Sequence, residues 1–179
     1  MADIILQGGL TVNKGIYFQR IMNAQQLSFS LASPNAGRVA QLISHLTPTA
    51  LDISGLTALG VGWLENTDAY NYVDIGVMVS AAFYPLLRVP AGVAFPVIYS
   101  PDLAVAPYAL AGTPAAWATN QGEVVNDLRT DPADASNWIC LVAHTSRATG
   151  NMADDRAAHP TYWASYVADV ILQAPIFDA

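Results

Sequence analysis

Three histidines, one cysteine and several clustered aspartates are the side chains of this 179-residue chain that could do chemistry. Nucleophilic catalysis requires a nucleophile, a base and an orienting group within reach of one another. The histidines, which are His45, His144 and His159, all lie outside any Gly-x-Ser-x-Gly segment. None of them is a sequence neighbour of Cys140, and a cysteine in an alternating apolar segment is usually a small buried hydrophobe. The sequence therefore predicts a non-enzymatic protein without catalytic residues.

Two groups of acidic residues are spaced closely enough to be considered as metal ligands. They are Asp154, Asp155 and His159, and Asp127, Asp131 and Asp134. The second group lacks the glycine and the terminal glutamate of an EF-hand loop, and the first lacks the paired histidines of a metal-dependent jelly roll. Solvated acidic loops account for both groups, and no glycine-rich phosphate-binding motif occurs. We expect no metal site and no cofactor.

The composition indicates a protein that associates with other subunits. Hydrophobic residues make up 53% of the chain, charged residues make up 12%, and the formal net charge is −7. Charged residues usually account for about 25% of a globular domain. A soluble chain with so few charges has to hide apolar surface in an oligomer. We therefore expect a homo-oligomer, such as a trimer or a similar ring.

The sequence disfavours contact with nucleic acids, contact with membranes and location in an oxidising compartment. Lys14 is the only lysine and the six arginines are scattered, so no basic patch is available for phosphates. The longest apolar stretches are shorter than the ~20 residues of a transmembrane helix, and no signal peptide is recognised. A single cysteine, Cys140, cannot form an intrachain disulfide. We expect no direct nucleic-acid contact, no membrane contact and synthesis in the cytoplasm of a host cell.

Alternation of apolar and polar residues indicates strands in the middle of the chain. Val73, Ile75, Val77 and Val79 fall on one face of a period-2 pattern, which is typical of a half-buried strand. Three further apolar runs, separated by proline and glycine, cover 83–89, 93–99 and 103–110. The spacing predicts an all-β fold, which is a jelly roll or a β-sandwich with extended N- and C-terminal segments.

Each of these runs contains a proline, at Pro85, Pro96 and Pro107. Proline cannot donate to a strand ladder, so within sheets it is confined to edges, strand starts and bulges. Several sheet edges are therefore expected, which is consistent with two small sheets.

Turn residues and changes in polarity divide the chain into three segments. An N-terminal arm with one strand covers 1–36, a β-sandwich or jelly-roll module covers 37–125, and an acidic loop, additional strands and a C-terminal tail cover 126–179. Within the module, 39–46 fits a short helix or a strand, and the neighbouring threonines favour the strand.

One element of the last segment fits either a strand or a helix. Residues 123–137 are predicted to be an exposed acidic loop, 138–144 a strand and 145–160 a polar loop. The run 162–172 fits a strand, but Trp163, Val167 and Ile171 are spaced by four, as in a helix. We favour the strand.

Three consecutive blocks in the middle of the chain carry a family resemblance. They are 59–68 (LGVGWLENTD), 71–77 (NYVDIGV) and 83–92 (FYPLLRVPAG). A strand ending in an asparagine turn, a V-x-I-G strand, an aromatic-Pro-Leu strand and a glycine turn follow one another in this order. This pattern resembles small jelly-roll structural proteins of tailed bacteriophage virions. It covers residues 55–112, departs after Gly92, where a polar residue is expected, and has no counterpart in the C-terminal third.

The resemblance implies a virion component on the head surface, such as a capsid decoration (cement) protein that stabilises the head lattice by binding the major capsid protein. Large apolar side chains outside the clearest strands are the interface candidates, and the C-terminal tip is a natural swapped or docked tail. The candidates are Trp63, Trp117, Trp163, Pro175, Ile176 and Phe177. The alternatives are a glycan- or host-surface-binding β-sandwich module and another head or tail structural component.

Overall fold

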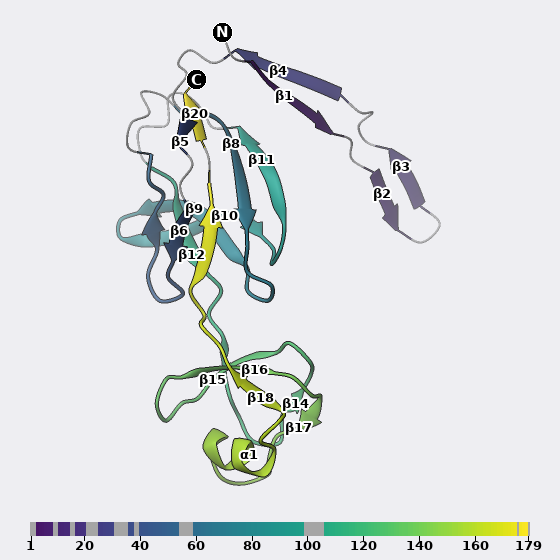
Figure 1. The fold of residues 1–179 in the computed structure, drawn as a ribbon, viewed down its shortest axis with the longest axis vertical. Helices are drawn as coiled ribbons and strands as arrows, with labels where there is room; N and C mark the ends of the chain where they lie inside the picture. Colours follow the sequence, from purple (N-terminus) through teal and green to yellow (C-terminus); the bar gives the residue numbers. More distant parts are fainter. Residues whose placement is uncertain are drawn as a thin grey trace.

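The computed structural model shows short strands and one short helix (Figure 1). The described residues are 3–8, 11–14, 17–20, 25–30, 36–37, 40–53, 59–98, 106–174 and 176–178. The predicted all-β fold is confirmed, because almost all described elements are strands and almost all pairings are antiparallel. None of the described residues forms a helix with the length and apolar character that crossing a bilayer requires.

The larger sheet is centred on β8 (Leu59–Asn66), which pairs with other strands on both sides. β11 (Ala94–Ile98) lies along one side of it. The remaining strands are β19 (Val170–Gln173), β20 (Ile176–Asp178), β6 (Ala40–Ile43) and β5 (Ala36–Gly37). β19 and β20 follow each other along the opposite side of β8, and β6 and β5 lie beyond them. The six strands therefore form four rows, with β11 at one edge and β5 and β6 at the other.

The smaller sheet has four strands. In order they are β10 (Ala82–Val89), β9 (Val73–Val79), β12 (Tyr108–Ala111) and β7 (Thr49–Ala50). The register between β10 and β9 shifts between Pro85 and Leu87, which is a bulge at a proline. Pro96 lies in the edge strand β11, and Pro107 directly precedes β12. All three prolines thus occupy the kinds of position that the sequence predicted.

One hydrophobic core joins the two sheets. Buried side chains of the larger sheet include Ile43 and Leu64, and those of the smaller sheet include Val73, Val89 and Ala109. They belong to a single cluster in which each of these five residues is at most 1% exposed. The two sheets therefore pack face to face as a sandwich.

The order of the rows follows from these pairings. Numbered 1 to 8 along the chain, the rows are β5/β6, β7, β8, β9, β10, β11, β12 and β19/β20. The larger sheet has the order 1-8-3-6 and the smaller sheet the order 2-7-4-5. Only rows 4 and 5 form a hairpin within one sheet, and every other connection crosses between the sheets. Each sheet is thus assembled from distant parts of the chain.

Between β12 and β19 the chain builds a second unit, which we call the inserted unit (Figure 1). Its elements are β13 (Ala115–Ala116), β14 (Gly122–Glu123), β15 (Leu128–Thr130), β16 (Asn137–Cys140), β17 (His144–Thr145), α1 (Met152–Ala158) and β18 (Trp163–Ser165). Its own core is formed by Trp117, Cys140, Met152 and Trp163. The sandwich and the inserted unit do not coincide with the predicted segments 37–125 and 126–179. The inserted unit begins before residue 126, and the C-terminal strands β19 and β20 return to the sandwich, where they pair with β6 and β5.

Asn71 holds the two connections between the sandwich and the inserted unit together. Its Nδ2 donates to the carbonyl oxygen of Gly112 at 2.8 Å and to that of Ala168 at 2.9 Å. Asn71 is 3% exposed, so neither bond competes with bulk water. The Tyr166 hydroxyl adds a third tie by donating to Asp68 Oδ1 at 2.9 Å. The inserted unit is therefore fastened to the sandwich at a defined neck.

Replacement of Asn71 by alanine should lower the free energy of unfolding by about 2–4 kcal/mol. Two buried carbonyl groups lose their donor, and an unsatisfied buried group costs about 1–3 kcal/mol. Urea denaturation and amide hydrogen exchange at residues 112–113 and 166–169 measure the effect. Asn71→Asp has nearly the same shape but presents an acceptor to both carbonyls, so wild-type stability of that variant would contradict the assigned role.

The N-terminal residues form a ribbon of paired strands. β1 (Asp3–Gly8) pairs with β4 (Gln25–Ser30), and β2 (Thr11–Lys14) pairs with β3 (Tyr17–Arg20). The sequence predicted one strand here, at 27–31, which corresponds to β4, and the structure adds three further strands, of which β1 is its partner. Within the described part of the chain, these strands pair only with each other, and Figure 1 shows them extending away from the sandwich.

The structure tests three predictions for the C-terminal third. The run 162–172 contains two strands, β18 and β19, so the strand prediction is confirmed and the helix alternative is wrong. The polar loop predicted for 145–160 contains the helix α1, which has a capping box at Asn151 and Asp154. The C-terminal tip, expected to be a swapped or docked tail, is docked in the larger sheet of its own chain, where β20 pairs with β5 on one side and β8 on the other.

Candidate functional site

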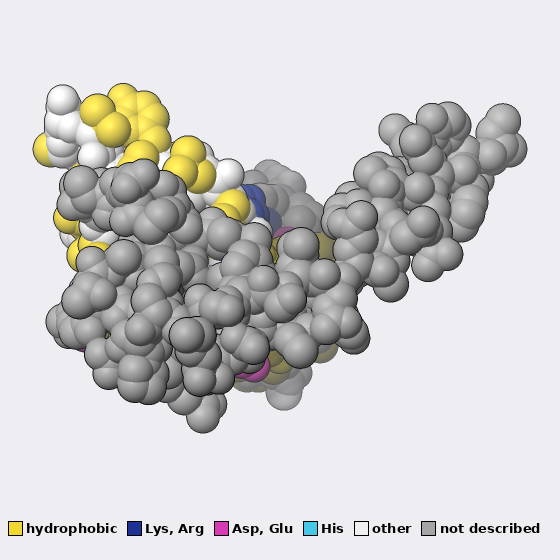
Figure 2. All heavy atoms as spheres, turned by 90° about the horizontal axis from the view of Figure 1, so that it is seen from above, with side chains coloured by type: hydrophobic (Ala, Val, Ile, Leu, Met, Phe, Trp, Pro, Cys, Tyr) yellow, Lys and Arg dark blue, Asp and Glu magenta, His cyan; other side chains and the backbone are white. Residues whose placement is uncertain are grey.

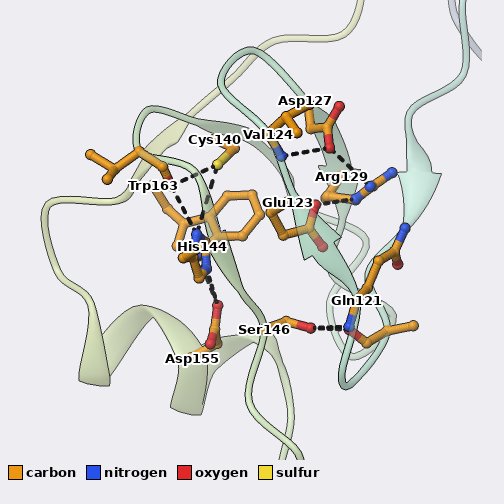
Figure 3. Close-up of polar contacts among 12 residues, drawn as sticks. Gln121, Glu123, Val124, Asp127, Arg129, Cys140, His144, Ser146, Asp155 and Trp163 are labelled. Carbon is orange, nitrogen blue, oxygen red and sulfur yellow. Dashed lines mark hydrogen bonds and ion pairs between the residues drawn. The ribbon is translucent and has the colours of Figure 1, made fainter.

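Four side chains with reactive or hydrogen-bonding groups meet inside the inserted unit (Figure 3). β16 ends at Cys140, the chain turns, and β17 begins at His144, so both residues face the same interior. α1 contributes Asp155 and β18 contributes Trp163. Cysteine, histidine and aspartate in contact are the components of a cysteine hydrolase triad, so their geometry decides whether catalysis is available.

Asp155 is the centre of this cluster. Its side chain has no exposed surface; its Oδ2 accepts from Trp163 Nε1 at 3.0 Å and lies 3.1 Å from His144 Nε2. Its Oδ1 accepts from the Arg147 backbone N–H at 3.1 Å. Burial alone raises the pKa of this carboxyl, but the bonds from His144, Trp163 and Arg147 outweigh burial and hold the pKa below its usual value. Asp155 is therefore a buried carboxylate that orients three donors.

His144 is held by oxygen atoms at both ring nitrogens. Its Nδ1 lies 2.9 Å from the carbonyl oxygen of Val142 but 3.9 Å from Cys140 Sγ. A carbonyl oxygen only accepts hydrogen bonds, so the contact with Val142 is a hydrogen bond only when Nδ1 carries a proton. The Cys140 thiol lies 1.0 Å farther from this nitrogen than the Val142 carbonyl oxygen does, at 3.9 Å against 2.9 Å.

Cys140 is fully buried, and its Sγ donates to the same Val142 carbonyl at 3.2 Å. Burial raises the pKa of the thiol, which disfavours the nucleophilic thiolate. The cluster thus resembles a triad in composition but not in hydrogen bonding. Its geometry fits a structural role, in which Cys140 is a core residue of the inserted unit.

The Cys140 thiol should react with iodoacetamide about 100-fold or more slowly in the folded protein than in 8 M urea at the same pH. Local opening has to precede the reaction, and the raised pKa reduces the thiolate fraction. Mass spectrometry of samples taken over time measures the rate. Alkylation of the folded protein at the unfolded rate would contradict this structural role and reopen the question of catalysis.

A second buried polar contact joins Glu123 to Arg129. Arg129 Nε donates to Glu123 Oε2 at 2.7 Å, and Arg129 Nη2 donates to Asp127 Oδ2 at 3.2 Å. The Glu123 side chain has no exposed surface and that of Arg129 is 11% exposed. Burial raises the pKa of Glu123, while Arg129 opposes the shift. The exposed acidic loop predicted for 123–137 is corrected in part: it contains the strand β15 and the buried charges of Glu123, Arg129 and Asp131, while residues 132–135 are exposed.

The aspartates considered as metal ligands point to separate partners. Asp127 binds Arg129, Asp131 binds Arg156, and Asp134 binds Ser136. Asp154 caps α1 through Asn151, and the His159 ring stacks on Tyr162 with a centroid distance of 4.7 Å. In the part of the chain that the structure describes, no three acidic, histidine or cysteine side chains are placed to hold a metal ion.

An open depression of 500 Å³ marks the surface of the inserted unit. Its lining includes Trp117, Thr119, Asp131, Pro132, Asn151 and Met152. Stacking on a sugar requires an exposed aromatic face, but Trp117 is 6% exposed. The exposed aromatic residues that are described, Trp63, Tyr70 and Tyr84, come from β8, the neck and β10 respectively. This arrangement does not favour a glycan platform.

The predicted interface residues have different positions in the structure. Trp63 is 39% exposed on β8, in agreement with a surface role. Trp117 and Trp163 are 6% exposed in the core of the inserted unit, so they are core residues and their assignment to an interface is corrected. Ile176 and Phe177 belong to the interior strand β20, and Pro175 lies outside the described residues.

An exposed apolar pair on the same sheet as Trp63 was not predicted from the sequence. Leu42 on β6 is 59% exposed and Ile171 on β19 is 50% exposed, and the two residues lie directly opposite each other. Only the register of the two strands identifies them as surface residues, so this part of the larger sheet is the candidate interface. Comparison with protein-family models, curated proteins and solved structures finds no match to this chain.

Proposed function

We propose that this chain is a non-enzymatic structural protein of a virion, of the capsid decoration (cement) type. The observation that carries the proposal is the row order 1-8-3-6 and 2-7-4-5. Eight antiparallel rows in two sheets, with nearly every connection crossing between them, support a jelly-roll arrangement, which is frequent in viral capsid proteins. The resemblance of residues 55–112 to phage jelly-roll proteins points in the same direction.

Because a fold hosts many functions, the sites have to support the proposal as well. The Cys140, His144 and Asp155 cluster is closed and held by structural hydrogen bonds. Jelly-roll enzymes of the cupin type need a cluster of metal ligands, and the described residues offer none. A structural role therefore accounts for the described clusters better than catalysis does.

The positions of the arm and of the inserted unit suit a lattice-binding protein. Figure 1 shows the N-terminal ribbon and the C-terminus at one end of the sandwich and the inserted unit at the other. In this proposal the ribbon end contacts neighbouring subunits and the major capsid protein on the head surface, and the inserted unit projects outward. The chain assembles as a homo-oligomer, such as a trimer, without direct contact to nucleic acid or membrane.

Removing this chain from the particle tests the proposal. Heads that lack the protein should assemble with normal dimensions but release their genome at a lower temperature, because a decoration protein binds and stabilises only the assembled lattice. Electron microscopy and a thermal release assay measure both properties. Failure to form heads, or loss of tails with heads of unchanged thermal stability, would contradict a decoration role.

A further inference from the structure

The outer face of the larger sheet is an apolar surface that no described element covers. Antiparallel neighbours share a face, so the register defines this surface. Its eight positions are Leu42 and Ile171, then Ala40, Gln173, Glu65 and Ala94, then Trp63 and Pro96. Six of the eight are apolar, and Leu42, Ile171 and Trp63 are 59%, 50% and 39% exposed. In the view from above (Figure 2), most of the visible surface belongs to residues that are not described, and the described side chains in view are mostly hydrophobic, with some charged ones among them.

The register of the N-terminal ribbon places apolar residues opposite one another on the paired strands β1 and β4. The register pairs Ile4 with Phe29 and Leu6 with Leu27, which places four large apolar residues on one face of the ribbon. A two-stranded ribbon alone is marginally stable in water and needs a further apolar surface. The described strands of the ribbon pair with no strand of the sandwich.

Charge also favours contact between the ribbon and the rest of a chain. Residues 1–30 contain Lys14, Arg20 and one acidic residue, Asp3, which gives a formal charge of +1. The remaining five arginines and thirteen acidic residues give the rest of the chain a formal charge of −8. Glu65 lies within the outer face itself. The opposite signs of these charges favour contact between the ribbon and the body of a neighbouring chain.

Edge pairing is a less suitable mode of contact for this sheet. The β11 edge carries Pro96, which lacks an amide hydrogen, and the opposite edge is made of the short strands β5 and β6. Prolines and short edge strands oppose the addition of further strands. Contact through the face has no such obstacle.

We infer that the outer face of the larger sheet binds the N-terminal ribbon of a second copy of this chain. Figure 1 shows the ribbon extending away from its own sandwich, so a second copy brings the two apolar surfaces together. This inference deepens the self-assembly within the proposed function and rests on it, but it requires no capsid. Purified protein is therefore sufficient to test this inference, whereas the decoration role is tested in particles. Failure of one can be distinguished from failure of the other.

Two matched substitutions test the inference in the full-length chain. Leu42 and Val124 are both 59% exposed, but Val124 lies in the inserted unit. Leu42→Glu should reduce the molar mass measured by light scattering to that of a 19.0 kDa monomer, and Val124→Glu should leave the oligomer intact. Equal effects of both variants, or an intact oligomer with Leu42→Glu, would overturn the inference.

Cross-linking identifies the two surfaces directly. A chain with Leu6→Cys and one tag is mixed with a chain with Leu42→Cys and another tag, and a short bismaleimide is added. A product that carries both tags is expected with Leu42→Cys and none with Val124→Cys, while wild-type chains control for Cys140. A double variant that links only within one chain would assign the ribbon to its own sheet and overturn the two-copy contact.

Discussion

Replacing Asp155 by alanine is expected to lower the free energy of unfolding of the inserted unit by about 3–5 kcal/mol, because one partner of a buried charged contact is lost. His144 Nε2, Trp163 Nε1 and the Arg147 amide all direct hydrogen bonds at this carboxylate. Without it, three donors in a closed interior have no acceptor. Urea denaturation followed by tryptophan fluorescence measures the loss, since three of the four tryptophans lie in the inserted unit.

The adjacent carboxylate provides the control, and pH provides a second test. Asp154 is exposed and its Oδ2 accepts from the Asn151 backbone N–H in the capping box of α1, so Asp154→Ala should cost only about 0.5–2 kcal/mol. The folded pKa of Asp155 is lowered, so its stabilisation is present above the unfolded pKa and is lost as pH falls through the folded pKa. The difference between wild type and Asp155→Ala should therefore persist at neutral pH and shrink below about pH 4. Equal costs for both variants would contradict the role of Asp155.

Arg129→Met should also destabilise the inserted unit by about 3–5 kcal/mol, because it leaves the fully buried carboxylate of Glu123 without its cation. Methionine preserves most of the apolar length of the side chain, so the effect reports the missing charge. Arg147→Met makes the same change at an exposed position and should cost less than about 0.5 kcal/mol. Chemical denaturation of the three proteins gives the comparison.

The Arg129→Met variant should recover stability on acidification. Burial already raises the folded pKa of Glu123, and loss of Arg129 removes the contact that opposes this shift. A raised folded pKa means that stability is lost as pH rises from the unfolded pKa through the folded pKa. The deficit of the variant should therefore be larger at pH 8 than near the ordinary carboxyl pKa of about 4.3. A loss of stability that does not change with pH would contradict the role of the Glu123 charge and would indicate that Arg129 acts through packing.

Local patterns in the sequence predicted most of the strands of the sandwich. The alternation at residues 73–79 corresponds to β9, and the Pro90–Gly92 turn separates β10 from β11, with Gly92 at a φ of +65°. The predicted bulge and edge positions of the prolines have the same local origin, because a missing amide hydrogen limits where proline fits. These features depend only on nearby residues.

The features that the sequence did not reveal depend on distant contacts. The C-terminal tip reads as an apolar tail, and only its pairing with β8 and β5 makes β20 an interior strand. α1 has seven residues, too few to show a helical period, although its Asn151 and Asp154 capping box was a usable signal.

The candidate site was hidden for the same physical reason. Cys140 and His144 meet because the chain reverses between them, and Asp155 reaches them from α1. Their hydrogen bonds depend on the Val142 carbonyl, a backbone group that residue types do not indicate. Likewise, the exposure of Leu42 and Ile171 follows from the register of β6 and β19.

The central claim is that this chain is built to associate with copies of itself, and the molar mass of the purified full-length protein tests it most directly. Size-exclusion chromatography with light scattering over a dilution series is the measurement. The account predicts one species whose mass is a fixed multiple, greater than one, of 19.0 kDa at every concentration. A mass of 19.0 kDa across the whole series would contradict it.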